Sequence, residues 1–463
     1  MTDNKLGAYN IADLRDMARG HLPRAIFEFI DRGTEDDVAL ANNREAFDRI
    51  KLRARTLVDV SKRSQEITLF GNKQPLPIVI APTGTAGLLW HNGEVGMARA
   101  AAAAGIPFTV ATNSMTPMET IVREAGGRLW FQLYMWSDRR LSHQLVERAN
   151  RAGFEALIVT VDGAVAANRE FSHRNGFSVP MKLNSRLVAD VMMHPRWLAG
   201  VYLRQLLTSG TPRFDNYPPE IQDKITARTF KKSILKNDSL NWDDLRALRK
   251  LWPRTLMIKG TLHPEDAKLA ADCGIDGLIV SNHGGRMLDS SLAPIDVLPS
   301  MVDAVGKKLT VMMDSGVRRG ADVVKALALG AQAVWTGSMW LTTFEGQIDA
   351  AVTSKLIKAG SSDTIRSKAI TGKYARQLRT KWTEAWENPA NPNPLPMPMQ
   401  FLLTAEAVER IHRHAKETGN VDLVAAPVGQ IVGRLNEIRP AAEVIAEMKR
   451  EYYATLAALR GIV

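Results

Sequence analysis

Short apolar runs recur eight times between residues 77 and 337, and polar turns flank each of them. They are PIVIAP (77–82), PFTVAT (107–112), LWFQLY (129–134), ALIVTVD (156–162), LMIKG (256–260), GLIVSN (277–282), LTVMMDSG (309–316) and AVWTG (333–337). Strands that are apolar on both faces are typical of parallel sheets covered by helices. Helical patterns such as GEVGMARAAAAAG and HPEDAKLAADCG lie between the runs and end at glycine. Eight strand–helix units in this order predict an α/β fold, the (β/α)8 or TIM barrel.

Three segments fall outside this repeating pattern. A helical segment precedes the first strand, and an insertion at about 175–235 follows the fourth strand and contains HPRWLAGVYLRQLLTSG. That insertion is too long for an ordinary loop, so we expect a lid, a subunit contact or a membrane-contacting segment. After the eighth strand, a Pro/Asn-rich linker at 386–400 lies within a tail with helical patterns. We therefore divide the chain into a barrel domain, 1–345, and a helical C-terminal extension, 346–463.

The formal net charge is +11, from 60 Lys and Arg against 49 Asp and Glu. This balance fits a solvated basic surface first of all, and otherwise nucleic acid, an anionic membrane surface or anionic ligands. Because no zinc-ligand spacing and no aromatic RNA-binding signature accompanies it, we expect neither a metal nor a nucleic-acid partner. The single cysteine, Cys273, fits a reducing compartment. With no signal-peptide pattern and no long apolar run, we expect a cytoplasmic protein, or one attached peripherally to the inner face of the membrane.

Polar or titratable residues follow nearly every predicted strand. The carboxyl ends of barrel strands meet at one mouth, where the reactive groups of such folds lie. A partly buried charge at such a position is costly unless it has a partner or a function. The sequence therefore predicts a site formed by Pro82 and Thr83, Gln132 and Tyr134, Thr160 and Asp162, Lys259, Ser281 and His283, Asp314, and Gly337 and Ser338.

The residue types at this mouth suggest their chemistry. His283 with Asp162 makes a base and a carboxylate that can orient it, whereas a lone histidine would more often be structural. Arg286 and Arg169 present planar forks suited to a carboxylate, although each alone fits a surface arginine equally well. Lys259 would place a positive charge beside an electron-accepting ring. The segment DSGVRRG (314–320) predicts a phosphate site, with exposed amides, Ser315, Arg318 and the next helix N-terminus.

Five segments together resemble the FMN-dependent 2-hydroxy-acid dehydrogenase/oxidase family, which includes glycolate oxidase and the L-lactate and (S)-mandelate dehydrogenases. The resemblance covers about residues 8–330. The insertion is similar to those of the membrane-associated mandelate and lactate dehydrogenases. The segments that carry the resemblance are FQLY (131–134), TVD (160–162) with Arg169, IKG (258–260), SNHGGRMLD (281–289) and DSGVRRG (314–320).

The resemblance implies oxidation of an L-2-hydroxy acid to the 2-oxo acid, with FMN across the barrel mouth. His283, oriented by Asp162, would remove a proton from the substrate, and Arg286 and Arg169 would clamp its carboxylate. Tyr134 would hydrogen-bond near the reacting oxygen, and Lys259 would stabilise negative charge on the flavin. The electron acceptor would be quinone if the insertion docks on a membrane, and oxygen or a soluble carrier otherwise. The residues implied to hold FMN are Pro82, Thr83, Gly84, Gln132, Thr160, Lys259, Ser281, Asp314, Ser315, Gly316, Arg318, Gly337 and Ser338.

The sequence departs from that family at several places. Phe29 stands where the family has a carboxylate-binding tyrosine, and Ala111 where it has a flavin-contacting serine. Gly337-Ser338 replaces a Gly-Arg pair whose arginine holds the phosphate. Residues 326–463 resemble the C-terminal part of nitronate monooxygenases, which are also FMN barrels. Two alternatives therefore stay open, a nitronate monooxygenase-like flavoenzyme and a flavin-binding protein with little turnover. A monomer and a homo-oligomer both stay open, since the hydroxy-acid family is commonly tetrameric and nitronate monooxygenases are usually monomers or dimers.

Overall fold

The computed structural model describes most of the chain in two compact units. One unit comprises Ala18–Thr342 with Ile445–Val463, and the other Met1–Met17 with Thr343–Val444. Gly337 and Ser338, two of the predicted cofactor ligands, lie outside the described residues. The described residues are 10–53, 63–177, 185–222, 238–336, 364–370, 375–388, 390–395, 399–418 and 422–423.

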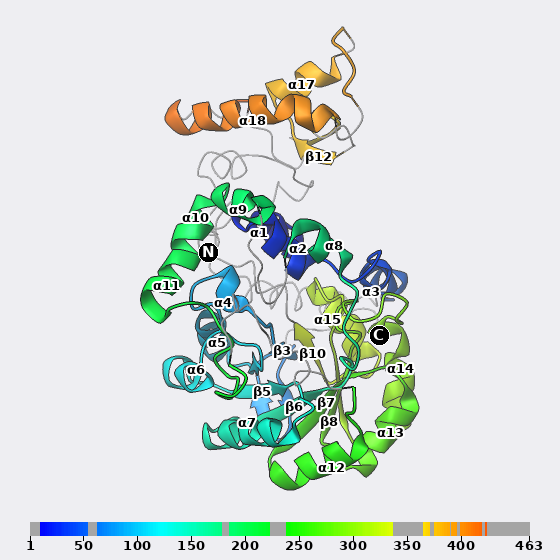
Figure 1. The fold of residues 1–463 in the computed structure, drawn as a ribbon. Coiled ribbons are helices and arrows are strands. Elements are labelled where there is room, and N and C mark those ends of the chain that lie inside the picture. Colours follow the sequence, from blue (N-terminus) through cyan, green and yellow to red (C-terminus); the bar gives the residue numbers. More distant parts are fainter. Residues whose placement is uncertain are drawn as a thin grey trace. The chain divides into compact units, whose positions relative to one another are not determined.

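Eight parallel strands close into a barrel in the order β10-β3-β4-β5-β6-β7-β8-β9, which confirms the predicted fold (Figure 1). Each strand is almost wholly buried, as expected for a sheet covered on both faces. All eight predicted strands are present: β3 (Ile78–Ile80), β4 (Phe108–Ala111), β5 (Leu129–Leu133), β6 (Ala156–Thr160), β7 (Thr255–Thr261), β8 (Gly277–Val280), β9 (Thr310–Met313) and β10 (Ala333–Thr336).

Helices follow the strands and cover the outside of the barrel. Capping residues mark where several of these helices begin. At the start of α7 (Arg139–Arg151), the Asp138 carboxylate accepts the amide N–H of Arg140 at 3.1 Å, and at the start of α12 (Trp242–Leu251), Asn241 and Asp244 form a capping box. Several end at glycines with positive φ, for example Gly126 and Gly306. These helices are α4 (Ala86–Leu89), α5 (Gly93–Ala103), α6 (Met118–Ala125), α7 (Arg139–Arg151), α12 (Trp242–Leu251), α13 (Pro264–Asp272), α14 (Pro294–Val305) and α15 (Gly320–Ala328).

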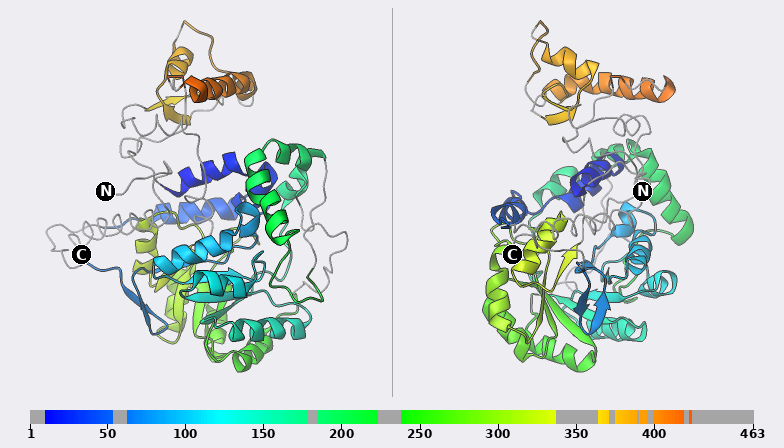
Figure 2. Two further views of the ribbon diagram at one scale, coloured as in Figure 1. Left: turned by 90° about the vertical axis from the view of Figure 1, so that its left-hand side faces the viewer. Right: turned by 180° about the vertical axis from the view of Figure 1, so that it is seen from behind.

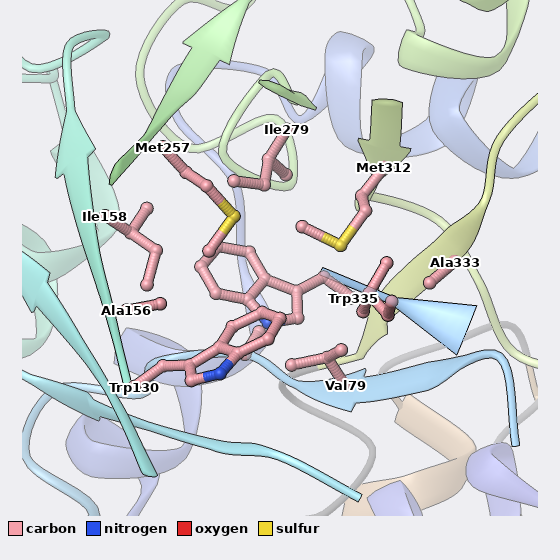
Figure 3. Packing of buried hydrophobic residues seen from close by; sticks show 11 residues of the cluster. Val79, Trp130, Ala156, Ile158, Met257, Ile279, Met312, Ala333 and Trp335 are labelled. Carbon is pink, nitrogen blue, oxygen red and sulfur yellow. The ribbon is translucent and has the colours of Figure 1, made fainter. Parts of the chain in front are cut away.

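Large side chains fill the barrel interior. Trp130 and Trp335 are each 1% exposed and lie among Val79, Ile158 and the two methionines drawn in Figure 3. A hairpin that the sequence pattern did not predict, β1 (Ile67–Leu69) and β2 (Asn72–Gln74), adds Leu69 to this cluster. Its turn residue Phe70 packs edge-on against Trp130, with 5.9 Å between ring centroids. The packed interior leaves chemistry to the carboxyl ends of the strands.

The predicted insertion after β6 consists largely of short helices. The Trp197 indole donates a hydrogen bond to the carbonyl of Leu88 at 2.9 Å, and Asp190 accepts the amide N–H of Ala25 at 3.1 Å. The insertion thus packs beside α4 and α2 (Figure 2). The elements are α8 (Glu170–Asn175), α9 (Ser185–Met192), α10 (Pro195–Trp197), the π-helix η1 (Leu198–Leu203) and α11 (Arg204–Ser209); the N-terminal helices are α1 (Ile11–His21), α2 (Arg24–Asp31) and α3 (Val38–Arg49).

The C-terminal unit contains the helices α17 (Lys381–Glu387) and α18 (Met399–Thr418), as expected for a helical extension. It also contains an antiparallel pair that the sequence pattern did not predict, β11 (Thr364–Ser367) with β12 (Ala375–Leu378). Buried polar side chains hold these elements together, since Gln377 donates to the Ser367 carbonyl at 3.2 Å. Within the described ranges, no helix combines the length and apolar character needed to span a bilayer.

Candidate active site

Three of the predicted side chains form one hydrogen-bonded chain at the barrel mouth. Nδ1 of His283 lies 2.9 and 3.1 Å from the two carboxylate oxygens of Asp162. Nε2 of the same ring lies 3.3 Å from the hydroxyl of Tyr134. A carboxylate at Nδ1 selects the tautomer with the proton on Nδ1, so the lone pair is on Nε2. His283 can therefore accept a proton at Nε2.

Burial and the neighbouring charges determine the protonation states of His283 and Asp162. Burial lowers the pKa of His283, and the Lys259 charge lowers it further against the opposing effect of Asp162. Burial alone would raise the pKa of Asp162, but the charges of His283 and Lys259 hold it below its usual value. At neutral pH the pair is a neutral imidazole beside an ionised carboxylate, which is a base with its orienting partner.

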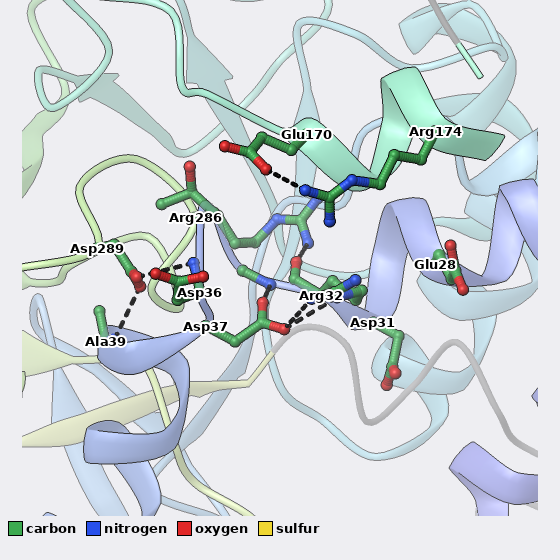
Figure 4. A network of polar contacts seen from close by, with 12 residues as sticks. Glu28, Asp31, Arg32, Asp36, Asp37, Ala39, Glu170, Arg174, Arg286 and Asp289 are labelled. Atoms are coloured by element: carbon green, nitrogen blue, oxygen red, sulfur yellow. Dashed lines mark hydrogen bonds and ion pairs between the residues drawn. The ribbon is translucent and has the colours of Figure 1, made fainter. Parts of the chain in front are cut away.

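The loop that carries His283 is held in an unusual conformation. His283 has φ of +58°, and Gly285 has φ of +73° with Leu40 so near that an added Cβ would lie 2.5 Å from its nitrogen. The amide of His283 donates to Ser281 Oγ at 3.0 Å. Asp289 accepts the amides of Asp36 and Ala39 at 3.1 and 3.0 Å, at the start of α3 (Figure 4). Contacts with the start of α3 thus fix the loop that carries His283.

Lys259 lies at the end of β7 and is 5% exposed. Its ammonium donates to Ser281 Oγ at 2.8 Å and lies 3.2 Å from the Asp314 carboxylate. Burial alone would lower the pKa of Lys259, but the carboxylates of Asp314 and Asp162 raise it above its usual value. The mouth therefore holds a permanent positive charge at its floor.

The two predicted arginines both lie close to the Phe29 ring, with guanidinium carbons 5.5 Å (Arg169) and 5.7 Å (Arg286) from the ring centroid. Arg286 donates to the carbonyls of Phe29 at 2.5 Å and Ile30 at 3.3 Å, and also to that of Arg32 (Figure 4). It thereby caps the C-terminal end of α2. Several of its donors are already engaged, which the sequence could not reveal.

Arg169 differs from Arg286 in its partners. Its buried Nε finds no hydrogen-bond partner among the residues that the structure describes. Burial lowers the pKa of Arg169, and burial together with the Arg169 charge lowers that of Arg286 to about 9. Both side chains remain cationic at neutral pH. Two adjacent cations with an unpartnered buried donor form a site that an anion would stabilise.

The predicted cofactor-binding residues at β3, β5 and β6 surround the same mouth. The side-chain amide of Gln132 donates from Nε2 to Thr160 Oγ1 at 2.8 Å. Its side-chain oxygen Oε1 accepts the backbone N–H of Thr112 at 3.3 Å. Thr83, in the loop Pro82–Gly84, has a buried hydroxyl without a partner among the described residues. An orphaned hydroxyl beside buried amides fits a polar heterocycle such as the flavin ring.

The predicted phosphate site has a more restricted set of donors than expected. The Asp322 carboxylate accepts the amides of Arg318 and Arg319 at 2.9 and 3.0 Å and pairs with Arg44 at 2.7 Å. Those two amides are therefore not available to a ligand. The turn itself fits, because Ser315 and Gly316 have φ of +71° and +86°. Such a turn presents successive amides toward an anion.

Comparison with known proteins places the chain in a family. The pattern of the family described as FMN-dependent dehydrogenase matches residues 18–366. The (S)-mandelate dehydrogenase of Pseudomonas putida is 39% identical over 329 residues, which are 71% of this chain and 82% of that protein. The L-lactate dehydrogenase of Caulobacter vibrioides is 40% identical over 347 residues, 74% of this chain and 89% of that protein. The chain belongs to the FMN-dependent dehydrogenases.

Solved structures agree with this assignment. The crystal structure of the monotopic membrane protein (S)-mandelate dehydrogenase superimposes with a TM-score of 0.68 at 38% identity, over 72% of this chain and 88% of that one. The protein is thus an FMN-dependent enzyme of the group that contains the mandelate and L-lactate dehydrogenases. The family match continues to residue 366, beyond residue 326, where the resemblance to nitronate monooxygenases was predicted to begin. The comparisons give no support to that second resemblance.

Sequence reasoning did not identify the residues that position the loop of His283. Asn282 and Asn43 exchange side-chain hydrogen bonds at 2.9 and 2.7 Å, and Asn282 also accepts the Gly285 amide at 3.0 Å. Both asparagines are buried. The asparagine in SNHGG was a visible signal, but its partner lies 239 residues away in α3.

Proposed function

We propose that the protein oxidises an L-2-hydroxy acid of the lactate, mandelate and glycolate class to the 2-oxo acid, with His283 as the base. The observation that carries this proposal is the Asp162–His283–Tyr134 hydrogen-bonded chain, which lies in one mouth with Arg169. When FMN is bound, it accepts the two electrons of the oxidation. The residues of this chain then have to bind the acid, orient it and accept a proton.

The proton transfer depends on His283 and its neighbours. Nε2 accepts a proton from the 2-hydroxy acid, and the ring becomes an imidazolium beside the Asp162 carboxylate. That carboxylate stabilises the new charge and keeps the ring in place. Burial raises the pKa of Tyr134 above its ordinary value, so its hydroxyl stays protonated and can donate to the substrate oxygen.

The substrate carboxylate binds at the two arginines. Arg169 contributes the guanidinium whose Nε is unpartnered, and Arg286 adds a second positive charge while it holds the end of α2. Phe29 has no hydroxyl to donate, so this interaction depends on the two arginines. A guanidinium–carboxylate pair in a partly buried site is stronger than a neutral hydrogen bond and fixes orientation.

The flavin is held around the rim by polar groups from successive strands. Lys259 would stabilise negative charge on the bound flavin, since Asp314 and Asp162 keep its ammonium protonated. The turn at 314–316 and Arg318 would bind the FMN phosphate. The other proposed contacts are Pro82, Thr83, Gly84, Gln132, Thr160 and Ser281.

An anaerobic substrate panel tests this proposal. The purified yellow protein is mixed without oxygen with (S)-mandelate, L-lactate or glycolate, and flavin absorbance near ~450 nm is followed. Bleaching by at least one acid is expected. Bleaching by alkyl nitronates alone would instead indicate a nitronate monooxygenase-like enzyme. A protein that retains FMN and reacts with neither class would be a flavin-binding protein with little turnover.

We also propose that the insertion contacts a membrane surface peripherally and that a membrane quinone accepts the electrons. Leu207 is 88% exposed and Met193 is 78% exposed, and exposed arginines are close to these apolar residues in the sequence. Exposed apolar residues with flanking cations favour an anionic bilayer interface. A solved relative is a monotopic membrane protein. The exposed apolar residues are Val188, Met192, Met193, Leu203 and Leu207, with Arg186, Arg196 and Arg204 nearby in sequence.

Sedimentation with vesicles of anionic lipid tests the membrane contact. Leu207→Asp should release the protein into the supernatant, whereas Leu269→Asp, on α13 outside the insertion, should leave binding unchanged. Equal sedimentation of both variants and the unmodified protein would contradict the proposal. Turnover with a soluble quinone analogue, compared with oxygen and a soluble dye, tests the acceptor.

A further inference from the structure

The chain beyond the insertion helices returns to the barrel mouth through Tyr217. This side chain is 6% exposed, and its ring packs edge-on against Trp136 with centroids 5.1 Å apart. Trp136 follows Tyr134 by two residues along the chain. Tyr134 also raises the pKa of Tyr217, in addition to the larger effect of burial, which agrees with the proximity of the two phenols.

The Tyr217 hydroxyl donates a hydrogen bond to Oδ1 of Asn113 at 2.9 Å. Asn113 lies in the loop after β4, and its carbonyl accepts the Thr85 amide at 3.1 Å. A Cβ added to Gly84 would lie 3.2 Å from the Cβ of Asn113. The residue before it, Thr112, accepts the amide of Tyr134 at 3.0 Å. Asn113 is therefore held between the loop of Gly84 and the end of β5, which Tyr134 directly follows.

The hydrogen bond to Tyr217 determines which end of the Asn113 amide remains available. With Oδ1 engaged, the side chain has two N–H donors on Nδ2, and neither donates to a residue that the structure describes. Asn113 is only half-buried, so the amide is not enclosed by protein. A rigidly oriented amide donor at the edge of a substrate site discriminates between ligands with and without an acceptor.

We propose that Asn113, oriented by Tyr217, is a specificity-determining residue that favours 2-hydroxy acids whose side chain carries a hydroxyl or carbonyl oxygen. This inference rests on the proposed hydroxy-acid dehydrogenase function and names its substrate class more closely. A hydrocarbon side chain would remove water from the Asn113 amide without replacing its hydrogen bonds. An oxygen acceptor would restore them, which makes the difference between two acids of similar size large.

Matched pairs of substrates test the proposal. Glycerate is compared with 2-hydroxybutanoate, and 4-hydroxymandelate with 4-methylmandelate, because each pair has the same number of heavy atoms and differs in one oxygen. The value of kcat/KM is measured for both members, and the ratio reports the acceptor preference. The unmodified protein should prefer the oxygenated member of the pair whose side chain reaches Asn113, by roughly tenfold or more.

Three variants separate a specific role from a structural one. Asn113→Leu keeps the approximate shape of the side chain but removes both amide N–H donors, so it should abolish the preference. Tyr217→Phe removes only the hydroxyl and should reduce the ratio about threefold or more, because Asn113 is no longer oriented. The control Tyr202→Phe, in η1 of the same insertion and stacked on Trp197, should leave the ratio unchanged.

FMN content and melting temperature confirm that each variant is folded. An unmodified protein without acceptor preference in either pair would overturn the inference. So would an Asn113→Leu variant that keeps the unmodified ratio, or a Tyr217→Phe variant that slows both members of a pair equally. A different result would refute the proposed function itself: an unmodified protein that oxidises no 2-hydroxy acid at all. That result would also refute the inference, which rests on the proposed function.

Discussion

The substitution Asp162→Asn should slow flavin reduction strongly without changing the shape of the site. The carboxylate oxygens lie 2.9 and 3.1 Å from Nδ1 of His283, and both side chains are mostly buried, 11% and 21% exposed. The charge centres are then about 4 Å apart, and at an effective dielectric constant of about 20 the ion pair contributes roughly 4 kcal/mol once His283 is protonated. Loss of this ion-pair energy would lower the rate of flavin reduction by about a thousandfold.

The assay is stopped-flow absorbance of the flavin under anaerobic conditions at saturating substrate. We expect the reduction rate of Asp162→Asn to fall by about 10³-fold while FMN stays bound and KM changes little. Asp289→Asn is the control for loop integrity, since Asp289 holds the same loop to α3 but does not touch His283. A loss below about tenfold in Asp162→Asn, or an equal loss in both variants, would refute the reasoning.

Further predictions concern pH, substrate affinity and backbone strain. Because burial lowers the pKa of His283 from 6.5 and the base must be neutral, kcat/KM should rise with pH along a limb centred below pH 6.5, as pH–rate profiles will show. Asp162→Asn should move that limb to still lower pH, because Asp162 raises the pKa of His283; a shift upward would contradict this. Arg169→Met should raise KM by about 10- to 100-fold, with the exposed Arg174→Met as control, and an unchanged KM would exclude Arg169 from carboxylate binding. Gly285→Ala should lower stability by about 2 kcal/mol or more in denaturant titrations, and clearly more than Gly284→Ala. Both glycines have positive φ, but an added Cβ lies 2.5 Å from Leu40 nitrogen at Gly285 and no nearer than 3.8 Å to any atom at Gly284.

The barrel could be predicted because its signal is local and repeated. Each strand is a short apolar run that is buried in the structure, and each residue directly after a strand must face the same mouth. Asp162 and His283 are predicted from this rule because they follow β6 and β8 within three residues, and Lys259 because it lies near the end of β7. The hairpin β1–β2 could not be found in the same way, because its strands are three residues long and β2, NKQ, has no apolar residue.

The hydrogen-bond partners of the site residues could not be predicted from the sequence, for a different reason. Arg286 uses its donors on the carbonyls of α2, and Asp322 takes the amides of Arg318 and Arg319. These choices depend on side-chain direction and on segments more than 250 positions apart, such as Phe29 and Arg286. The contribution of Tyr217 is hidden for the same reason, since nothing in FDNYPP indicates a contact with Asn113.

The role of His283 is the claim on which the mechanism depends, and one measurement tests it most directly. His283→Gln is mixed anaerobically with the acid that reduces the unmodified protein fastest, and the flavin spectrum is recorded over time. The account predicts a protein that still contains FMN and still binds the acid, but whose flavin stays oxidised. Reduction at a rate close to that of the unmodified protein would show that another group removes the proton.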